Sequence, residues 1–138
     1  MKKVLASLIF ALILVSLPLS LVGCGKSSGD GKAAYPEILT REYLIGEWVF
    51  DDFIAKNGAQ RPSDEKRERY LQEKYVFFEN GTVKHSDRKG DYYFDSFEIV
   101  EGYQVVLHSS DPDHYLEYSD GRLLTNYDTN IYIAFKKK

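Results

Sequence analysis

The sequence predicts an all-β protein: an eight-stranded antiparallel up-and-down meander that closes into a small barrel, with one short surface helix after the first strand. Three observations support this fold class. Many short segments alternate between apolar and polar residues, which is the period of a half-buried strand. The dipeptides Asn80-Gly81 and Asp120-Gly121 separate such segments and are typical of two-residue hairpins. Aromatic residues form 14% of the chain and are spread along it, so a hydrophobic core is available.

The folded part is expected to begin near Tyr35. One helical turn is expected over residues 40–45, because Thr40 is a good N-cap and Gly46 ends the turn. The first strand, residues 47–54, follows with period two. One side of this strand is predicted to carry Trp48, Phe50 and Ile54, and the other side Val49, Asp51 and Phe53.

The surface helix is predicted over residues 63–73, which are highly charged. Its acidic residues come first, as the positive end of a helix dipole favours. Tyr70 and Leu71 supply its only apolar contact. A charged segment of this kind usually forms a solvated face, so no function is assigned to it.

Seven further strands follow the helix and are joined by short turns. The long strand of residues 90–100 is expected to bend near Asp95-Ser96, and Pro112 marks a turn because proline cannot occupy a central strand. Eight strands close into a barrel that is filled by side chains or holds one small ligand. An open sheet capped by the predicted helix is the structural alternative. The seven strands are residues 74–79, 82–86, 90–100, 103–109, 114–119, 122–126 and 131–136.

Residues 1–23 have the layout of a secretory signal peptide. Lys2 and Lys3 precede an almost continuously apolar run. The run ends in Leu21-Val22-Gly23-Cys24, which resembles a bacterial lipobox. This resemblance implies cleavage before Cys24 and acyl chains on its sulfur, which anchor the mature chain in the cell membrane. The alternative is an uncleaved transmembrane helix over residues 4–22.

Residues 24–34 predict a lipidated cysteine followed by a flexible tether, because they contain glycine and serine but no large apolar side chain. The barrel domain then covers residues 35–138. The chain has a formal charge of −3, and without Lys2 and Lys3 it has 16 basic and 21 acidic residues, or −5. This mildly acidic balance argues against nucleic-acid binding. The single cysteine excludes an intramolecular disulfide.

Five segments follow one another along the folded part: Leu44-Ile45-Gly46-Glu47-Trp48, then residues 75–83, 90–93, 120–124 and 131–136. In this order they resemble the small lipocalin-like domains found on bacterial surface lipoproteins, and Gly46-Glu47-Trp48 is the best single mark. The resemblance implies a lipocalin-like barrel with Trp48 packed across its closed end. Lipocalins also have a Thr-Asp-Tyr-type motif, whose nearest match here is Thr125-Asn126-Tyr127. They carry an arginine near the last strand that stacks on the tryptophan; this chain offers Lys136, Lys137 and Lys138 there.

Six aromatic side chains are candidates for lining the barrel interior: Trp48, Phe50, Tyr75, Phe77, Tyr93 and Phe135. Two interpretations of these rings are open. They fill a packed core whose tyrosine hydroxyls reach the rim, or they line a hydrophobic cup for a small apolar or amphipathic ligand.

No catalytic residue, metal site or cofactor is expected. The sequence has no phosphate-binding glycine loop and no G-x-S-x-G motif. Asp51 and Asp52 are adjacent in a strand and point to opposite faces, so they do not form the facing carboxylate pair of a glycosidase. Asp52 either orients a ligand or lies in water at the barrel mouth. The aspartates and histidines near Pro112 are expected to form a polar turn rather than a metal site.

These observations favour a lipid-anchored, extracytoplasmic, lipocalin-like protein that binds rather than catalyses, with a small apolar or amphipathic ligand as its partner. The alternative is a cell-envelope protein-interaction module, of inhibitor or immunity type, whose barrel core is filled and whose loops contact another envelope protein.

The lipid anchor predicts that Cys24→Ala releases the protein from membranes or leaves it unprocessed, because the acylated thiol is lost. Membrane fractionation and lipid labelling of the variant beside the natural chain measure this. Unchanged processing and labelling would contradict the anchor.

Overall fold

A computed structural model of this chain describes residues 35–110 and 112–138. The predicted signal peptide (residues 1–23), the tether (24–34) and its Cys24 lie outside the described residues. The chain from Ala34 to Lys138 forms one compact unit with its own buried core, so it is expected to fold by itself. Its described elements are α1 (Arg41–Leu44), β1 (Gly46–Ala55), α2 (Asp64–Tyr70), β2 (Lys74–Phe77), β3 (Val83–Asp87), β4 (Gly90–Phe94), β5 (Ser96–Val100), β6 (Gln104–His108), β7 (His114–Ser119), β8 (Arg122–Asp128) and β9 (Ile131–Lys137).

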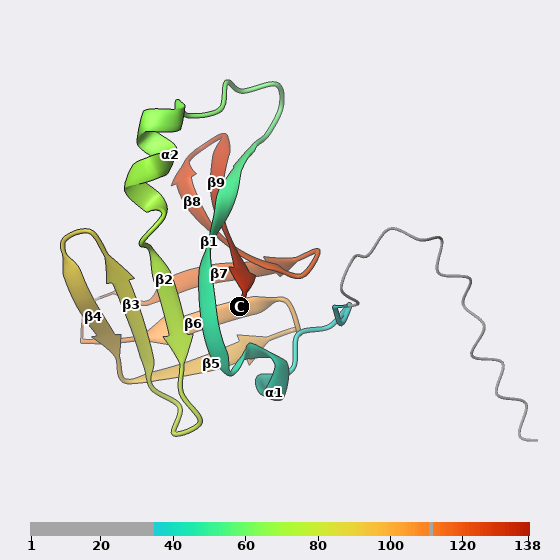
Figure 1. The fold of residues 1–138 in the computed structure, drawn as a ribbon. Coiled ribbons are helices and arrows are strands. Elements are labelled where there is room, and N and C mark those ends of the chain that lie inside the picture. Colours follow the sequence, from blue (N-terminus) through green and yellow to red (C-terminus); the bar gives the residue numbers. More distant parts are fainter. Residues whose placement is uncertain (1–34, 111) are drawn as a thin grey trace, which may run out of the picture. The chain divides into compact units, whose positions relative to one another are not determined.

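The strands form one antiparallel sheet that rolls into a nearly closed barrel, so the predicted all-β barrel is confirmed (Figure 1). The strand order is β4-β3-β2-β1-β9-β8-β7-β6-β5. Because β1 pairs with both β2 and β9, the first strand closes onto the last, as in an up-and-down barrel. The predicted hairpins join β2 to β3 and β7 to β8. Asp120-Gly121 forms the expected two-residue turn, whereas the loop between β2 and β3 is longer than predicted and runs from Phe78 to Thr82, with Asn80-Gly81 inside it.

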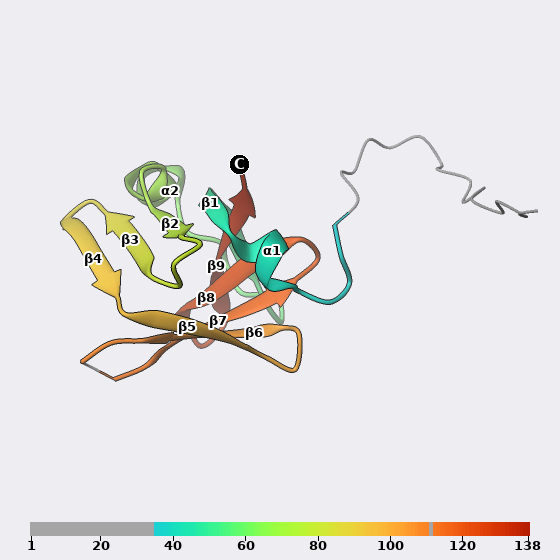
Figure 2. The same cartoon turned by 90° about the horizontal axis from the view of Figure 1, so that it is seen from below.

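The described residues contain nine strands rather than the predicted eight, because the predicted strand of residues 90–100 is divided into β4 and β5. The predicted bend near Asp95 is confirmed, and it is sharp enough to place β4 and β5 at opposite edges of the sheet. The backbone N–H of Asp95 already donates to the carbonyl of His108 on β6, at 2.9 Å. The barrel therefore has its seam where the chain passes from β4 into β5 (Figure 2).

A register shift in β1 changes the faces predicted for the second half of this strand. The pairing of β1 with β9 shifts between Phe50 and Asp52, so Asp51 is an extra residue, or β-bulge. Phe53 is consequently turned into the core, where it is 3% exposed, and Ile54 faces outward. The prediction that Ile54 shares the core side and Phe53 the opposite side is wrong, because strict alternation does not hold across a bulge.

The end of the barrel beside α1 is closed around Trp48, which is fully buried. The Trp48 indole N–H donates to the carbonyl of Leu44 at 2.8 Å. Lys137 reaches the same place from β9: its ammonium donates to the carbonyls of Tyr43 and Ile45 and lies 5.8 Å from the centre of the Trp48 ring. Lysine thus provides a cation–π contact at the place where the lipocalin resemblance implies an arginine.

Helix α2 lies beside β1 and is held there by ion pairs as well as by the packing of Tyr70 against Phe53. The Ser63 hydroxyl accepts the backbone N–H of Lys66 and so caps the helix, which is shorter than the predicted 63–73 segment. The bulge directs Asp52 outward, where its carboxylate pairs with Arg61 and Arg67. Asp52 therefore holds α2 and the preceding loop in place.

The bulge predicts that Phe53→Ala costs about 3–5 kcal/mol of unfolding free energy, the usual loss for a fully buried phenylalanine. The neighbouring Ile54→Ala is the matched control and should cost about 1 kcal/mol, because Ile54 lies on the partly exposed outer face. Urea denaturation of the two variants measures both changes. A larger loss for Ile54→Ala would contradict the bulged register.

Candidate functional site

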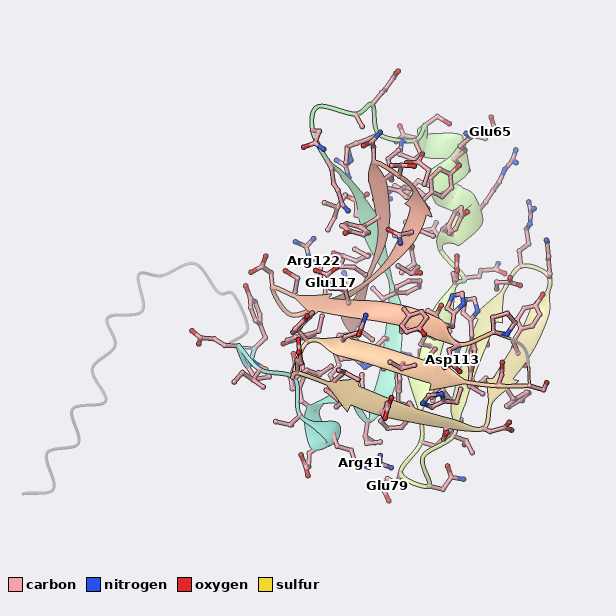
Figure 3. The ribbon with its side chains drawn as sticks, turned by 180° about the vertical axis from the view of Figure 1, so that it is seen from behind. Arg41, Glu65, Glu79, Asp113, Glu117 and Arg122 are labelled. Atoms are coloured by element: carbon pink, nitrogen blue, oxygen red, sulfur yellow. The ribbon has the colours of Figure 1, made fainter. Side chains whose placement is uncertain are left out.

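The end of the barrel opposite α1 contains a cavity of about 430 Å³, here called the mouth pocket. It is surrounded by α2, the turn between β3 and β4, and the strands β7 and β8 (Figure 1). In Figure 3, Glu65 on α2 lies at this end of the barrel, whereas Arg41 and Glu79 lie at the other end. The Arg41 guanidinium donates to the Glu79 carbonyl there, at 3.3 Å.

The floor of the mouth pocket is a stack of two rings held by a carboxylate. Tyr75 of β2 is 1% exposed, and the His85 ring of β3 lies parallel to it with 4.3 Å between ring centres. The pairing of β2 with β3 places these two residues opposite each other. Nε2 of His85 lies 3.0 Å from a carboxylate oxygen of Glu73, which precedes β2. Glu73 thereby fixes the orientation of the imidazole ring.

One wall of the pocket consists of Tyr70 from α2 and Tyr127 from β8, with 6.1 Å between their ring centres. Both tyrosines pack edge-on against Phe53, at 5.1 and 5.3 Å between ring centres. The bulged strand therefore supports this wall from behind. Burial, together with the nearby Glu73 carboxylate, raises the pKa of Tyr70. Burial also raises the pKa of Tyr75. Both phenols therefore remain neutral and can donate hydrogen bonds at neutral pH.

The rim of the pocket is cationic. Lys66 and Arg69 reach it from α2, and Arg88 and Lys89 reach it from the turn between β3 and β4. The carboxylate of Asp87 shapes that turn by accepting the backbone N–H groups of Lys89, at 2.6 Å, and of Gly90, at 3.1 Å.

A second cavity, of about 400 Å³, lies along the seam beside the mouth pocket. Its lining includes Tyr92 and Phe94 of β4, and it shares His85, Asp87 and His114 with the mouth pocket. The two cavities therefore meet at His85 and His114, and the cavity along the seam extends the mouth pocket.

Five of the six aromatic candidates are buried in the core: Trp48, Phe50, Tyr75, Phe77 and Phe135. Of these five, Tyr75 also lines the mouth pocket. The rings pack on one another, with 5.0 Å between the ring centres of Tyr75 and Phe135 and 5.2 Å between those of Phe77 and Phe97. The middle of the barrel is therefore a packed core, and the cavities lie at its open end and seam.

Tyr93 does not line the interior as predicted, because it is 66% exposed. It pairs with Lys84 on β3, whereas its neighbour Tyr92 pairs with His85 on the inner face. Alternation along β4 therefore turns Tyr93 outward. Its side chain borders the cavity along the seam.

Most of the pocket residues come from segments that the sequence analysis treated as surface or structural. Tyr70 belongs to the predicted surface helix, and His85 was not a candidate for any site. Thr125, Asn126 and Tyr127, the nearest match to the lipocalin motif, also line the pocket, although this match did not indicate a ligand site in the sequence.

The turn near Pro112 is polar, because a hydrogen bond of 2.9 Å joins Nδ1 of His108 and a carboxylate oxygen of Asp113; Asp111 lies outside the described residues. No group of three or more potential metal ligands was found among residues 35–110 and 112–138. In the same part of the chain, no helix has the length and apolar character needed to cross a membrane. The chain matches no known family, no curated protein and no solved structure.

The substitution His85→Ala in the pocket floor is predicted to cost about 2 kcal/mol of unfolding free energy, because a largely buried ring stack and a hydrogen bond to Glu73 are lost. His108→Ala is the matched control: His108 also faces a carboxylate, but its side chain is 36% exposed against 15% for His85. It should cost about 0.5 kcal/mol or less. Equal losses in thermal or urea unfolding would contradict the structural role of His85.

Proposed function

We propose that this chain is a lipid-anchored, extracytoplasmic, lipocalin-like protein that binds a small amphipathic ligand in the mouth pocket. The observation that supports this most is the contrast between the two ends of one barrel. The end around Trp48 is packed and closed, whereas the opposite end is hollow and lined by tyrosines, histidines and cations.

The size and chemistry of the mouth pocket suit such a ligand. Its volume of about 430 Å³ lies within the range of small-molecule sites, which is about 300–1,000 Å³. The tyrosine rings offer apolar surface, and their neutral hydroxyls offer hydrogen bonds. The buried core beneath the pocket keeps the ligand at the mouth, where it remains reachable from solvent.

The anchor and the location of the protein rest on the sequence alone. The basic start, the apolar run and Leu21-Val22-Gly23-Cys24 support lipidation at Cys24 and transfer out of the cytoplasm. We propose binding rather than catalysis, with no cofactor, because the sequence carries none of the catalytic motifs considered above.

A second candidate function is contact with another envelope protein through the outer face of β6, β7 and β8. Tyr103 and Tyr115 are 47% and 55% exposed there, beside the buried Val106 and Leu124. Exposed tyrosines next to apolar residues are common at protein interfaces. Tyr103 and Tyr115 do not line the mouth pocket, so substitutions of these tyrosines distinguish the two functions, although Thr125 and Asn126 border both surfaces.

Native mass spectrometry of residues 34–138, purified gently from host cells and compared with a denatured sample, tests the proposed function. A bound small molecule that is lost on denaturation is expected. Thr125→Trp should remove it, because the inward-facing Thr125 lines the pocket and indole would fill the space.

Tyr115→Ala is the control on the outer face and should retain the bound mass. Tyr127→Ala, which deletes a wall of the pocket, provides a second test should Thr125→Trp unfold. The second candidate function would replace the proposed one under two conditions. Every sample shows the mass of the protein alone, and Tyr115→Ala no longer captures an envelope protein that the natural chain captures.

A further inference from the structure

The charged side chains of the barrel show one unusual feature. Almost every cation in residues 35–110 and 112–138 has a partner: a carboxylate, a backbone carbonyl or an aromatic ring. Among these described residues, three cationic side chains lack such a contact: Lys66, Arg88 and Lys89. All three lie on the rim of the mouth pocket.

The acidic side chains of the pocket are already engaged. Glu73 faces the imidazole of His85, and Asp87 accepts two backbone N–H groups of its own turn. The fourth rim cation, Arg69, pairs with Glu65. The rim thus has an excess of positive charge on a chain whose formal charge is −3. A general basic surface does not account for this excess.

We propose that the mouth pocket selects an amphipathic anion, whose apolar or ring-shaped body lies against Tyr70 and Tyr127 and whose phosphate, sulfate or carboxylate group lies between Lys66, Arg88 and Lys89. The inference deepens the proposed function and depends on it. Cations on two opposed elements, α2 and the turn between β3 and β4, can contact one anionic group from both sides. The aromatic wall is at the same time available to an apolar body.

A matched pair of fluorescent probes tests the charge requirement on residues 34–138. The probe 8-anilinonaphthalene-1-sulfonate carries one anionic group, and N-phenyl-1-naphthylamine is the same molecule without it. The sulfonate probe is expected to bind at least about tenfold more tightly at low salt, since the three rim cations attract its charge. Its advantage should shrink as salt is raised.

The double substitution Arg88→Gln with Lys89→Gln should weaken the sulfonate probe about tenfold and change the neutral probe less than about twofold. Lys136→Gln with Lys138→Gln is the control, because it removes the same charge from paired cations elsewhere. Equal binding of both probes, or equal weakening in both double variants, would overturn the anion selectivity while leaving the proposed function intact. Failure of both probes to bind would overturn the proposed function as well.

The anionic group can belong to a free metabolite or to a lipid head group, and two further measurements separate these sources. If octanoate or octyl phosphate, below its micellar concentration, displaces the sulfonate probe, the anionic group belongs to a free ligand. Sedimentation with phosphatidylglycerol vesicles, but not with phosphatidylcholine vesicles, assigns a head group. Absence of both effects would overturn the inference.

Discussion

The arrangement of this protein depends on one extra residue in its central strand. Asp51 breaks the alternation of β1, so that Phe53 enters the core and Asp52 leaves it. The inward phenylalanine supports the tyrosine wall of the mouth pocket, and the outward carboxylate holds α2 beside the strand. Without the bulge, the Asp52 carboxylate would lie on the core side of the strand and the Phe53 ring on the outer side. The fold would then lose much stability, because burying an unpaired charge costs a large free energy.

The two ends of the barrel differ in packing and charge. The closed end contributes to the stability of the fold, and the open end is the proposed place of ligand binding. At the closed end, the indole N–H of Trp48 donates to the carbonyl of Leu44, and the ammonium of Lys137 donates to the carbonyls of Tyr43 and Ile45. In residues 35–110 and 112–138, no buried side-chain nitrogen or oxygen lacks a hydrogen-bond partner. At the open end, the Glu73 and His85 pair lies beneath the mouth pocket, and three of the four rim cations, Lys66, Arg88 and Lys89, lack a carboxylate partner among the described residues. Such charges contribute little to folding, and the proposed anionic ligand would supply their partner.

Local signals predicted most of the fold, and long-range geometry decided the rest. The hairpins at Asn80-Gly81 and Asp120-Gly121 were predictable because Gly81 and Gly121 adopt positive φ angles that suit tight turns. The bulge at Asp51 carries no such signal, since its effect appears only in the pairing of β1 with β9. The mouth pocket was missed for the same reason: Tyr70, His85 and Tyr127 come from three distant segments, and only the closed barrel brings them together.

The central claim is that binding occurs at the mouth and not inside the barrel. The most direct measurement is a two-dimensional ¹⁵N NMR spectrum of residues 34–138 recorded with increasing 8-anilinonaphthalene-1-sulfonate. Binding at the mouth should shift the ring signals of His85 and the amide signal of Tyr127 together, while the indole N–H of Trp48 stays in place. A shift of the Trp48 indole as large as that of His85 would instead place the ligand in the core.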